Sequence, residues 1–472
     1  MIEVLIYTPL VLVCFILLFK KRNPVVWILP AWSVIQTLLI VIIFSGYESN
    51  LMGITDKYFG ADKLTCFFLM ITGILYIGSS FHSIDVLKKS SGNERVFYNV
   101  NMLIFVFAIN SLLMSKHLGM MWVFIEATTL TGALLIYYEK KHSSIEAAWK
   151  YIFICSVGVA FAFIGIIFLS ASSPESIGLF FSDMNANAGS MNKLWLKFGY
   201  TFAVIGFGTK MGLAPVHSWL PDAHSEAPWP VSALLSGALL NGAFLAIIKL
   251  TKIADIAGLS SFSGKILLMM GLFSVLIAAV FIQKTKNYKR LLAYSSIENM
   301  GILALCLYAG PSAYFAALFH AAGHSLTKAS LFLTSGNIYR RFHSKDLFRV
   351  SGLMGVDRIS ALIWIISFFC IIASPPGMLF ISEFLLFKTL IDRGDYLLVI
   401  ILFVLISSVV YGASFALLKI CSGEPPEDVQ KEKLKVRNYL PQIGFLVIVL
   451  FLGVYLPDSL KKIIDDAVLL MR

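Results

Sequence analysis

Charged residues are scarce in this chain, and the scarcity excludes a soluble globular protein. Of its 472 residues, 14% are charged and 58% are hydrophobic. A soluble domain has about 25% charged and about 45–50% apolar residues. The composition therefore indicates a polytopic membrane protein. The net charge of +11 is better explained by cation-rich loops on one side of a membrane than by nucleic-acid binding.

Closely spaced cysteine pairs are also missing, and we expect no cleavable leader. The six cysteines are isolated, and the absence of any C-x-x-C pair argues against an iron–sulfur cluster or a structural zinc site in this chain. We interpret them as small buried hydrophobes. Residues 1–19 are apolar, but the basic residues 20–22 follow without an Ala-x-Ala-type cleavage site. We therefore expect the first span to remain in the mature protein.

Long apolar runs are what the sequence does contain. Each run is about 20 residues long, as a transmembrane helix requires, and none alternates as the strands of a membrane barrel do. The runs predict an all-α protein with about fourteen transmembrane helices, the twelfth being long and interrupted. The predicted spans are 3–19, 25–45, 63–81, 98–115, 118–138, 149–170, 194–213, 230–250, 265–283, 290–309, 312–336, 358–392, 396–420 and 438–456.

The distribution of cations between the loops predicts the orientation of the chain. Lysine and arginine concentrate in alternate loops, which the positive-inside rule assigns to the cytoplasm. These loops contain Lys20 to Arg22, Lys88, Lys89 and Arg95, Lys140 and Lys141, Lys284 to Arg290, Arg340 to Arg349, and Lys431 to Arg437. Both termini are then extracytoplasmic, and residues 458–472 are expected to form a short amphipathic helix at the outer surface.

Proline and glycine interrupt two of the predicted spans. Span seven ends at Gly212 and Pro215, and span twelve contains Pro375, Pro376 and Gly377. Broken helices at corresponding positions of two halves indicate a transport site. Each break falls in the fourth span of a five-span unit, and an odd number of spans inverts the second unit relative to the first. Ordinary proline kinks are the alternative.

The pattern of spans and breaks predicts four parts of the chain. Residues 1–97 carry the first three helices, and residues 98–250 form the first five-helix repeat. Residues 265–420 form the inverted second repeat, and residues 421–472 hold a linker, the last helix and a tail.

Two ionisable residues lie deep in the first predicted repeat. Glu126 is in span five and Lys210 is in span seven. A charge at the centre of a bilayer costs roughly 2.5–3.5 kcal/mol, so such residues are usually paired and functional. We expect the two to pair, and a change in their separation would load or release a proton. A static ion pair is the alternative.

Three ionisable residues lie in span eleven of the second predicted repeat. His320, His324 and Lys328 are spaced at i, i+4 and i+8, so they share one helix face. Because histidine titrates near neutral pH, this face suits a proton relay. A zinc site is a weaker alternative, since no glutamate lies between the histidines and Lys328 would repel the ion. Structural buried histidines are a further alternative.

Other ionisable residues are candidates for the same pathway. Glu383 lies beside the second break, as Lys210 lies beside the first, and Lys388 is a candidate partner for it. Glu298 is either a proton-uptake group or a structural hydrogen-bonding residue. His217 and His224 follow the first break, where they either supply protons from the cytoplasm or cap the next helix.

The run from Lys210 to Pro228 resembles the signature of the antiporter-like subunits shared by respiratory NADH–quinone oxidoreductases, membrane-bound hydrogenases and multi-subunit sodium/proton antiporters. The resemblance extends over predicted spans 4–13. Residues 234–241 and 289–301 look most similar to hydrogenase-4 component F and next to NADH dehydrogenase chain M.

The resemblance implies fourteen helices, two inverted five-helix repeats and a lateral proton path. That path would contain Glu126, Lys210, the span-eleven face and Glu383. Family members usually carry a lysine in span eight where this chain has Asn241, and Lys249 lies two turns further along. This departure weakens the expectation of a complete central relay.

The resemblance also implies the function and the partners. We expect a proton-translocating subunit of a hydrogenase-4-type complex in a prokaryotic inner membrane, with a chain M or N-type subunit or a sodium/proton antiporter subunit as alternatives. An inert scaffold is a further alternative. The chain itself would hold no cofactor, metal or redox site. Nickel–iron and iron–sulfur centres would belong to a soluble hydrogenase or dehydrogenase arm, joined by other membrane subunits.

Overall fold

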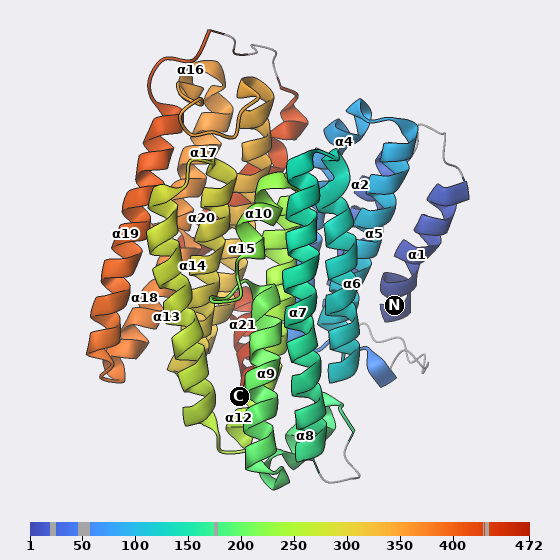
Figure 1. The fold of residues 1–472 in the computed structure, drawn as a ribbon, viewed down its shortest axis with the longest axis vertical. Helices are drawn as coiled ribbons and strands as arrows, with labels where there is room; N and C mark the ends of the chain where they lie inside the picture. Colours follow the sequence, from blue (N-terminus) through green and yellow to red (C-terminus); the bar gives the residue numbers. More distant parts are fainter. Residues whose placement is uncertain (19–24, 46–56, 174–177, 428, 430–433) are drawn as a thin grey trace.

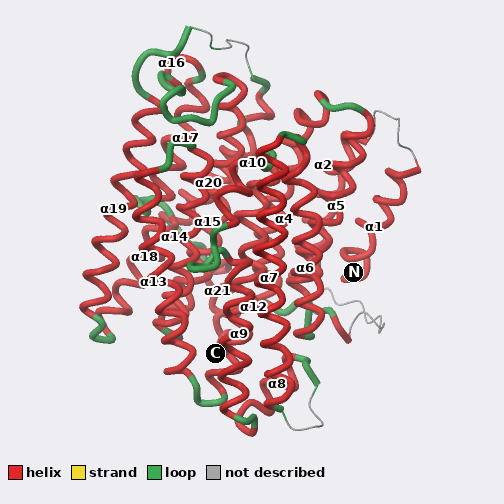
Figure 2. The backbone as a smooth tube through the Cα atoms, in the orientation of Figure 1, coloured by secondary structure: helices red, strands yellow, loops and turns green. Residues whose placement is uncertain are grey.

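The computed structural model describes residues 1–18, 25–45, 57–173, 178–427, 429 and 434–472 as a bundle of long helices (Figures 1 and 2). In these ranges the chain forms no strand, and only isolated bridges such as Phe59 with Ser115 occur. Nine helices or continuous helical runs in this part are long and apolar enough to cross a membrane. The protein is therefore an all-helical membrane protein, as its composition predicts.

The first half of the bundle contains the N-terminal helices and the helices around the first break. The N-terminal helices are α1 (Ile2–Leu18), α2 (Val25–Phe44) and α4 (Lys63–Lys89). They are followed by α5 (Gly92–Met114), α6 (Leu118–Ile136), α7 (His142–Ser172), the short α8 (Phe181–Asn187), α9 (Lys193–Met211), α10 (Trp219–Glu226), α11 (Trp229–Leu234), the π-helix η3 (Leu235–Leu239) and α12 (Leu240–Ile256).

The second half contains further long helices on either side of a second break. It comprises α13 (Ser260–Lys284), α14 (Tyr288–Ala309), α15 (Tyr314–Phe342), the short α16 (Leu353–Val356), α17 (Arg358–Ile371), α18 (Met378–Asp392) and α19 (Tyr396–Cys421). The chain ends with α20 (Leu440–Val454) and α21 (Asp458–Met471).

Both predicted breaks are present. Residues 212–218 separate α9 from α10, and residues 372–377 separate α17 from α18. Gly212 adopts a positive φ of 79°, and its N–H donates to the Thr209 carbonyl at 3.1 Å, which closes the last turn of α9. α9 therefore ends at Met211, one residue after Lys210.

The predicted eighth span differs from the expected single helix. It is divided by the π-helix η3, whose wider turn the apolar composition of this span does not signal. The most apolar 18 residues of the run Trp229–Ile256 are all buried, whereas only 22% of the corresponding residues of α19 are buried. The π-helix therefore lies at the centre of the bundle, and α19 lies at its edge (Figure 1).

Glycines bring α7 and α9 into close contact. A Cβ added to Gly165 would lie 2.4 Å from the backbone nitrogen of Ala203, and one added to Gly206 would lie 2.4 Å from that of Ala162. Such distances leave no room for any side chain. The two helices therefore pack backbone to backbone, as small residues allow in membrane proteins.

Ion pairs gather where the cation-rich loops meet. Asp85 at the end of α4 pairs with Arg340 of α15 and with Arg437, and Arg341 pairs with Asp357. These loops are among those predicted to face the cytoplasm, and they lie at the upper end of the bundle in Figure 1. The predicted cytoplasmic residues 20–22 and 431–433 lie outside the described residues.

The C-terminal residues form the predicted amphipathic helix. α21 turns by 87° from α20 and buries Ile464, Ala467, Val468 and Met471. Its neighbours include α4 and α15, and the Lys252 ammonium donates to the Leu470 carbonyl at 2.8 Å.

Candidate functional site

The Lys210 ammonium group bonds to a neutral hydroxyl. Lys210 occupies the last turn of α9 and is fully buried, and its Nζ donates to the Tyr151 hydroxyl at 3.0 Å. The same nitrogen lies 4.7 Å from the centroid of the Tyr151 ring, which adds a cation–π contact. In the described part of the chain, no carboxylate lies within the 4.0 Å of an ion pair with Lys210.

Glu126 therefore interacts with Lys210 at longer range than a direct ion pair. Its half-buried carboxylate accepts hydrogen bonds from Ser156 at 2.9 Å and from Thr129 at 3.1 Å. Its charge still acts on Lys210. Tyr151 and Ser156 both belong to α7, which contacts both α6 and α9. The acid and the base are thus linked through α7.

The first break holds this centre in place. Trp219, at the start of α10, donates from its indole nitrogen to the Thr209 carbonyl at 2.8 Å. Its ring also packs edge-on against Tyr151, with 5.0 Å between the ring centroids. The residue beyond the break therefore fixes both the end of α9 and the tyrosine that binds Lys210.

In the second half of the bundle, both ring nitrogens of His320 make hydrogen bonds. Its Nδ1 lies 2.9 Å from the Ser382 hydroxyl of α18, and its Nε2 lies 3.1 Å from the Asn299 side-chain oxygen of α14. His320 therefore ties α15 to the helices on either side of it.

The neighbouring charged residues are held less tightly. Both ring nitrogens of the fully buried His324 have no hydrogen-bond partner among the described residues. The Lys328 ammonium donates to the Leu292 carbonyl at 2.8 Å, and the charges of Lys328 and Glu298 act on each other across α14 and α15. Glu383 is buried next to Ser382, and Glu298 is the charged group that acts on it.

Asn241 joins the two halves of the bundle. Its amide donates to the Ser325 hydroxyl of α15 at 2.9 Å and to the Gly237 carbonyl of the π-helix at 2.8 Å. Ser325 follows His324 directly in the sequence. In the π-helix, the Ser236 hydroxyl lies 3.0 Å from that of Ser296 on α14. Asn241 and the π-helix thus make direct polar links to the second half.

Two predicted residues lie away from these centres. Lys249 donates to the Ser115 carbonyl at 3.1 Å and lines a cavity of about 490 Å³ with Asp62 and Lys252 near the C-terminal end of α12. Lys388 is exposed on α18.

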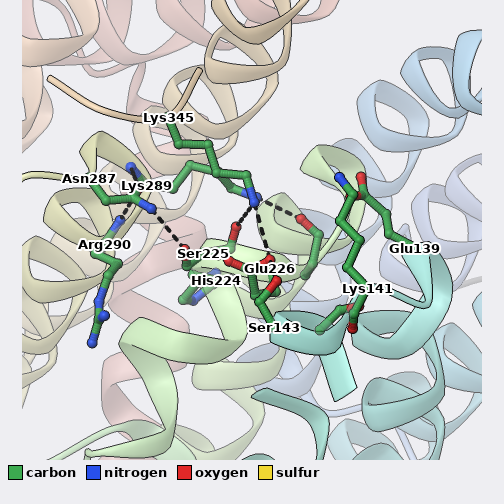
Figure 3. A network of polar contacts seen from close by, with 12 residues as sticks. Glu139, Lys141, Ser143, His224, Ser225, Glu226, Asn287, Lys289, Arg290 and Lys345 are labelled. Atoms are coloured by element: carbon green, nitrogen blue, oxygen red, sulfur yellow. Dashed lines mark hydrogen bonds and ion pairs between the residues drawn. The ribbon is translucent and has the colours of Figure 1, made fainter. Parts of the chain in front are cut away.

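A polar cleft opens among the ion pairs at the cation-rich end, and Figure 3 shows part of the polar network beside it. Its volume is about 180 Å³, and its walls carry Asp222, Ser225 and Glu226 of α10. Asp222 pairs with Arg290 at 2.9 Å and with Lys150 at 3.2 Å. The cleft is therefore a hydrophilic surface beside the end of α10.

The two predicted histidines after the first break lie at different depths. His217 is half-buried in the break itself. His224 is fully buried, its ring stacks on Phe332 of α15 at 4.7 Å, and neither ring nitrogen has a hydrogen-bond partner among the described residues. His224 thus faces α15 from α10.

The described residues contain no group of three His, Cys, Asp or Glu side chains that could hold a metal ion. Ionisable side chains lie buried or half-buried on α6, α9, α14, α15 and α18, and hydroxyl and amide side chains bond to several of them, an arrangement that suits proton transfer. Three members of this row, Tyr151, Asn299 and Ser382, are neutral, and their residue types give no functional signal in an apolar helix.

Comparison with known proteins gives a consistent family. The family described as NADH:quinone oxidoreductase/Mrp antiporter, TM matches residues 115–410. A Methylacidiphilum infernorum protein named as a homologue of hydrogenase-4 component F is 32% identical over 431 residues, covering 88% of this chain and 89% of its own. NADH-quinone oxidoreductase subunit M of Pseudomonas aeruginosa is 27% identical over 406 residues, covering 84% and 78%.

A solved structure agrees with these matches at the level of the fold. A chain of the Mrp complex from Dietzia sp. superimposes with a TM-score of 0.86 and 16% identity, covering 99% of this chain and 96% of that one. Together these findings confirm the resemblance indicated by residues 210–228.

Proposed function

The chain belongs to the NADH:quinone oxidoreductase/Mrp antiporter family of membrane subunits, and on that premise we propose that it translocates protons for a hydrogenase-4-type complex. The hydrogenase-4 assignment rests on the likeness to the component F homologue. The proposed translocation residues are Glu126, Lys210, His320, His324, Lys328 and Glu383, with Asn241 and Glu298 as further members of the row.

The hydrogen bond of the buried Lys210 ammonium to Tyr151 carries the proposal. A carboxylate in direct contact would hold the ammonium form firmly, whereas a neutral hydroxyl and a more distant Glu126 do so weakly. A change in the distance between Glu126 on α6 and Lys210 on α9 would then change the proton affinity of Lys210.

The proposal includes the finer organisation of the chain. It assumes fourteen spans with inverted repeats at 98–250 and 265–420, and a location in a prokaryotic inner membrane with both termini outside. Redox chemistry would take place on nickel–iron and iron–sulfur centres of a soluble arm, and this chain would move protons in response.

The test uses the full-length chain in liposomes that contain a trapped pH indicator dye. A potassium diffusion potential drives proton influx, and the Lys210→Ala variant is compared with the wild type. We expect a loss of influx of at least about a hundredfold, because a proton-transfer group contributes about 10²–10⁴-fold. An unchanged influx in the variant would overturn the proposal and support a scaffold role.

The same liposomes separate this function from a sodium/proton antiporter subunit, which the match to the Mrp complex makes the second candidate. An imposed sodium gradient should leave the internal pH unchanged in the absence of a membrane potential. A sodium-driven pH change that disappears in Lys210→Ala would favour the antiporter function.

A further inference from the structure

A buried lysine that is not among the predicted translocation residues lies at the cation-rich end of the bundle. Lys289 is the second residue of α14 and is fully buried. Its Nζ donates to the Ala227 carbonyl at 2.6 Å and lies 4.6 Å from the Trp229 ring centroid. Neither contact supplies a negative charge.

The carboxylates around Lys289 are already engaged by other lysines. The charged groups that act on Lys289 include Glu139, Glu226, Lys141 and Lys345. Glu139 pairs with Lys141 at 2.6 Å, and Glu226 pairs with Lys345 at 3.4 Å. The two carboxylates near Lys289 are therefore each paired with another lysine, and Lys289 has no carboxylate of its own among the described residues. Because a buried charge is costly without its own counter-ion, the Lys289 proton is weakly held.

The position of Lys289 is fixed by the start of its helix. The Asn287 side chain caps α14 by accepting from the Lys289 backbone nitrogen at 2.9 Å, and its amide donates to the Ser225 hydroxyl at 2.9 Å. Lys345 donates to the Ser225 carbonyl at 2.7 Å. Figure 3 shows Lys289, Lys345 and Asn287 arranged around Ser225 and Glu226.

Lys289 contacts the end of α10, which joins the polar cleft to a histidine that faces the second half. Its ammonium bonds to the Ala227 carbonyl directly after α10, and Ser225 and Glu226 of α10 line the cleft of about 180 Å³. His224, the residue before Ser225, is buried and stacks on Phe332 of α15. The charges of Lys289 and Lys328 both act on His224. The end of α10 therefore brings the cleft, Lys289 and a histidine that contacts α15 together.

We propose that Lys289 is the residue through which protons pass from the polar cleft to His224 and then to the α15 face. The proposal rests on the proposed function. In this step an N–H bond of the Lys289 ammonium breaks as its proton passes to water, and water delivers a proton that forms a new N–H bond on a ring nitrogen of His224, which has no hydrogen-bond partner among the described residues. The neutral amine is recharged by a proton from the water-accessible cleft.

An arginine substitution distinguishes this role from that of a structural brace. Arginine retains the positive charge, the donor to Ala227 and the contact with Trp229, but it does not release its proton. A brace would therefore tolerate Lys289→Arg, whereas a proton carrier would not. Lys345→Arg is the matched control, because Lys345 has a carboxylate partner in Glu226.

The experiment measures dye-reported proton influx in liposomes that contain the full-length chain, driven by a potassium diffusion potential. We expect Lys289→Arg and Lys289→Gln to lower influx by at least about a hundredfold, as the loss of a proton-transfer group does. Lys345→Arg should stay within about twofold of wild type, and thermal melting should show that all three variants fold.

Two results would overturn the proposal. One is wild-type influx in Lys289→Arg. The other is a failure of both Lys289 variants to fold, which would make Lys289 a brace. Lys210→Ala is measured in parallel. If Lys210→Ala abolishes influx and Lys289→Arg does not, the proposed function stands and only the role of Lys289 fails.

Discussion

The two charged centres of the molecule differ in what holds their polar groups. In the first half, Lys210 bonds to Tyr151, and Glu126 accepts from Ser156 and Thr129. In the second half, Lys328 bonds to a backbone carbonyl, and His324 has no partner among the described residues. Buried polar groups of the second kind usually bind internal water. The first centre is thus organised by protein side chains, and the second is suited to a hydrated path.

This difference bears on how the centres respond when a charge is removed. The partners of Lys210 and Glu126 are neutral hydroxyls, so each charge loses little when the other is absent. The interaction between Lys328 and Glu298 has no such support, since in the described part of the chain no side chain donates a hydrogen bond to Glu298. The second centre should therefore be more sensitive to single substitutions.

The largest expected effect comes from Lys328→Met, which leaves Glu298 buried without its cation. Glu298 is not in ion-pair contact with Lys328, but it has no hydrogen-bonding side chain of its own among the described residues. A buried charged group left without support costs more than the ~1–3 kcal/mol of a neutral one, so we expect the free energy of unfolding to fall by about 3 kcal/mol or more. Lys210→Met should cost about 1–3 kcal/mol, because it leaves only a neutral hydroxyl without a partner. Unfolding in mixed detergent micelles measures both values. The double variant with Glu298→Gln should regain most of the loss, and equal costs for the two lysines would contradict the contrast.

A second prediction compares the two histidines of α15. His320→Leu leaves Ser382 and Asn299 without their common partner and should destabilise the fold by about 1–3 kcal/mol. His324→Leu removes two unpartnered buried nitrogens and should leave stability unchanged or slightly raised. Both variants should lose proton influx in liposomes. A larger stability cost for His324→Leu than for His320→Leu would show that His324 has the stronger partners.

The sequence predicted the features that are energetically costly in an apolar helix, namely the buried charges and the two helix breaks. Charged residues in hydrophobic runs can be recognised because they are costly in a membrane and therefore usually functional. They are Lys210, Glu126 and the span-eleven face. The two breaks can be recognised because proline and glycine interrupt helices. The positions of both breaks and the family are confirmed. The direct pairing of Glu126 with Lys210 was not found, because α7 places the Tyr151 hydroxyl beside the lysine.

Other parts of the site could not be found from the sequence. Tyr151 and Ser382 are ordinary residues of apolar helices, and only tertiary packing gives them a role. The π-helix before Asn241 shifts the hydrogen-bond register without changing the composition. Lys289 was passed over because it lies among the loop cations Lys286 and Arg290, where a lysine is normally exposed. Roles for neutral or loop-edge residues emerge only when the helices are assembled.

Tyr151→Phe tests the first centre with a smaller change in stability. The variant keeps the ring beneath Lys210 and removes only the hydroxyl that accepts from its ammonium group. The expected cost is about 1 kcal/mol, typical of one hydrogen bond. Influx should fall by about tenfold, since the hydroxyl links Lys210 to α7 and the glutamate side of the path.

The matched control for Tyr151→Phe is Tyr98→Phe. Tyr98 is equally buried, and its hydroxyl lies 2.8 Å from that of Ser83, away from the charged row. The stability cost should be similar and influx should be unchanged. A similar loss of influx in both variants would indicate a general effect of hydroxyl removal.

The smallest expected effect concerns Lys388, which the sequence offered as a partner for Glu383. Lys388 is exposed on α18, whereas Glu383 on the same helix is buried. An exposed substitution away from special contacts usually changes stability by less than about 0.5 kcal/mol, so Lys388→Gln should match the wild type in melting and influx. Glu383→Gln should lower influx, because Glu383 follows the His320 partner Ser382 in α18 and Glu298 acts on it. If Lys388→Gln lowered influx as much as Glu383→Gln, the path would have to leave the bundle along the exposed face of α18, and the second centre would be open to the surroundings rather than enclosed between α14 and α15.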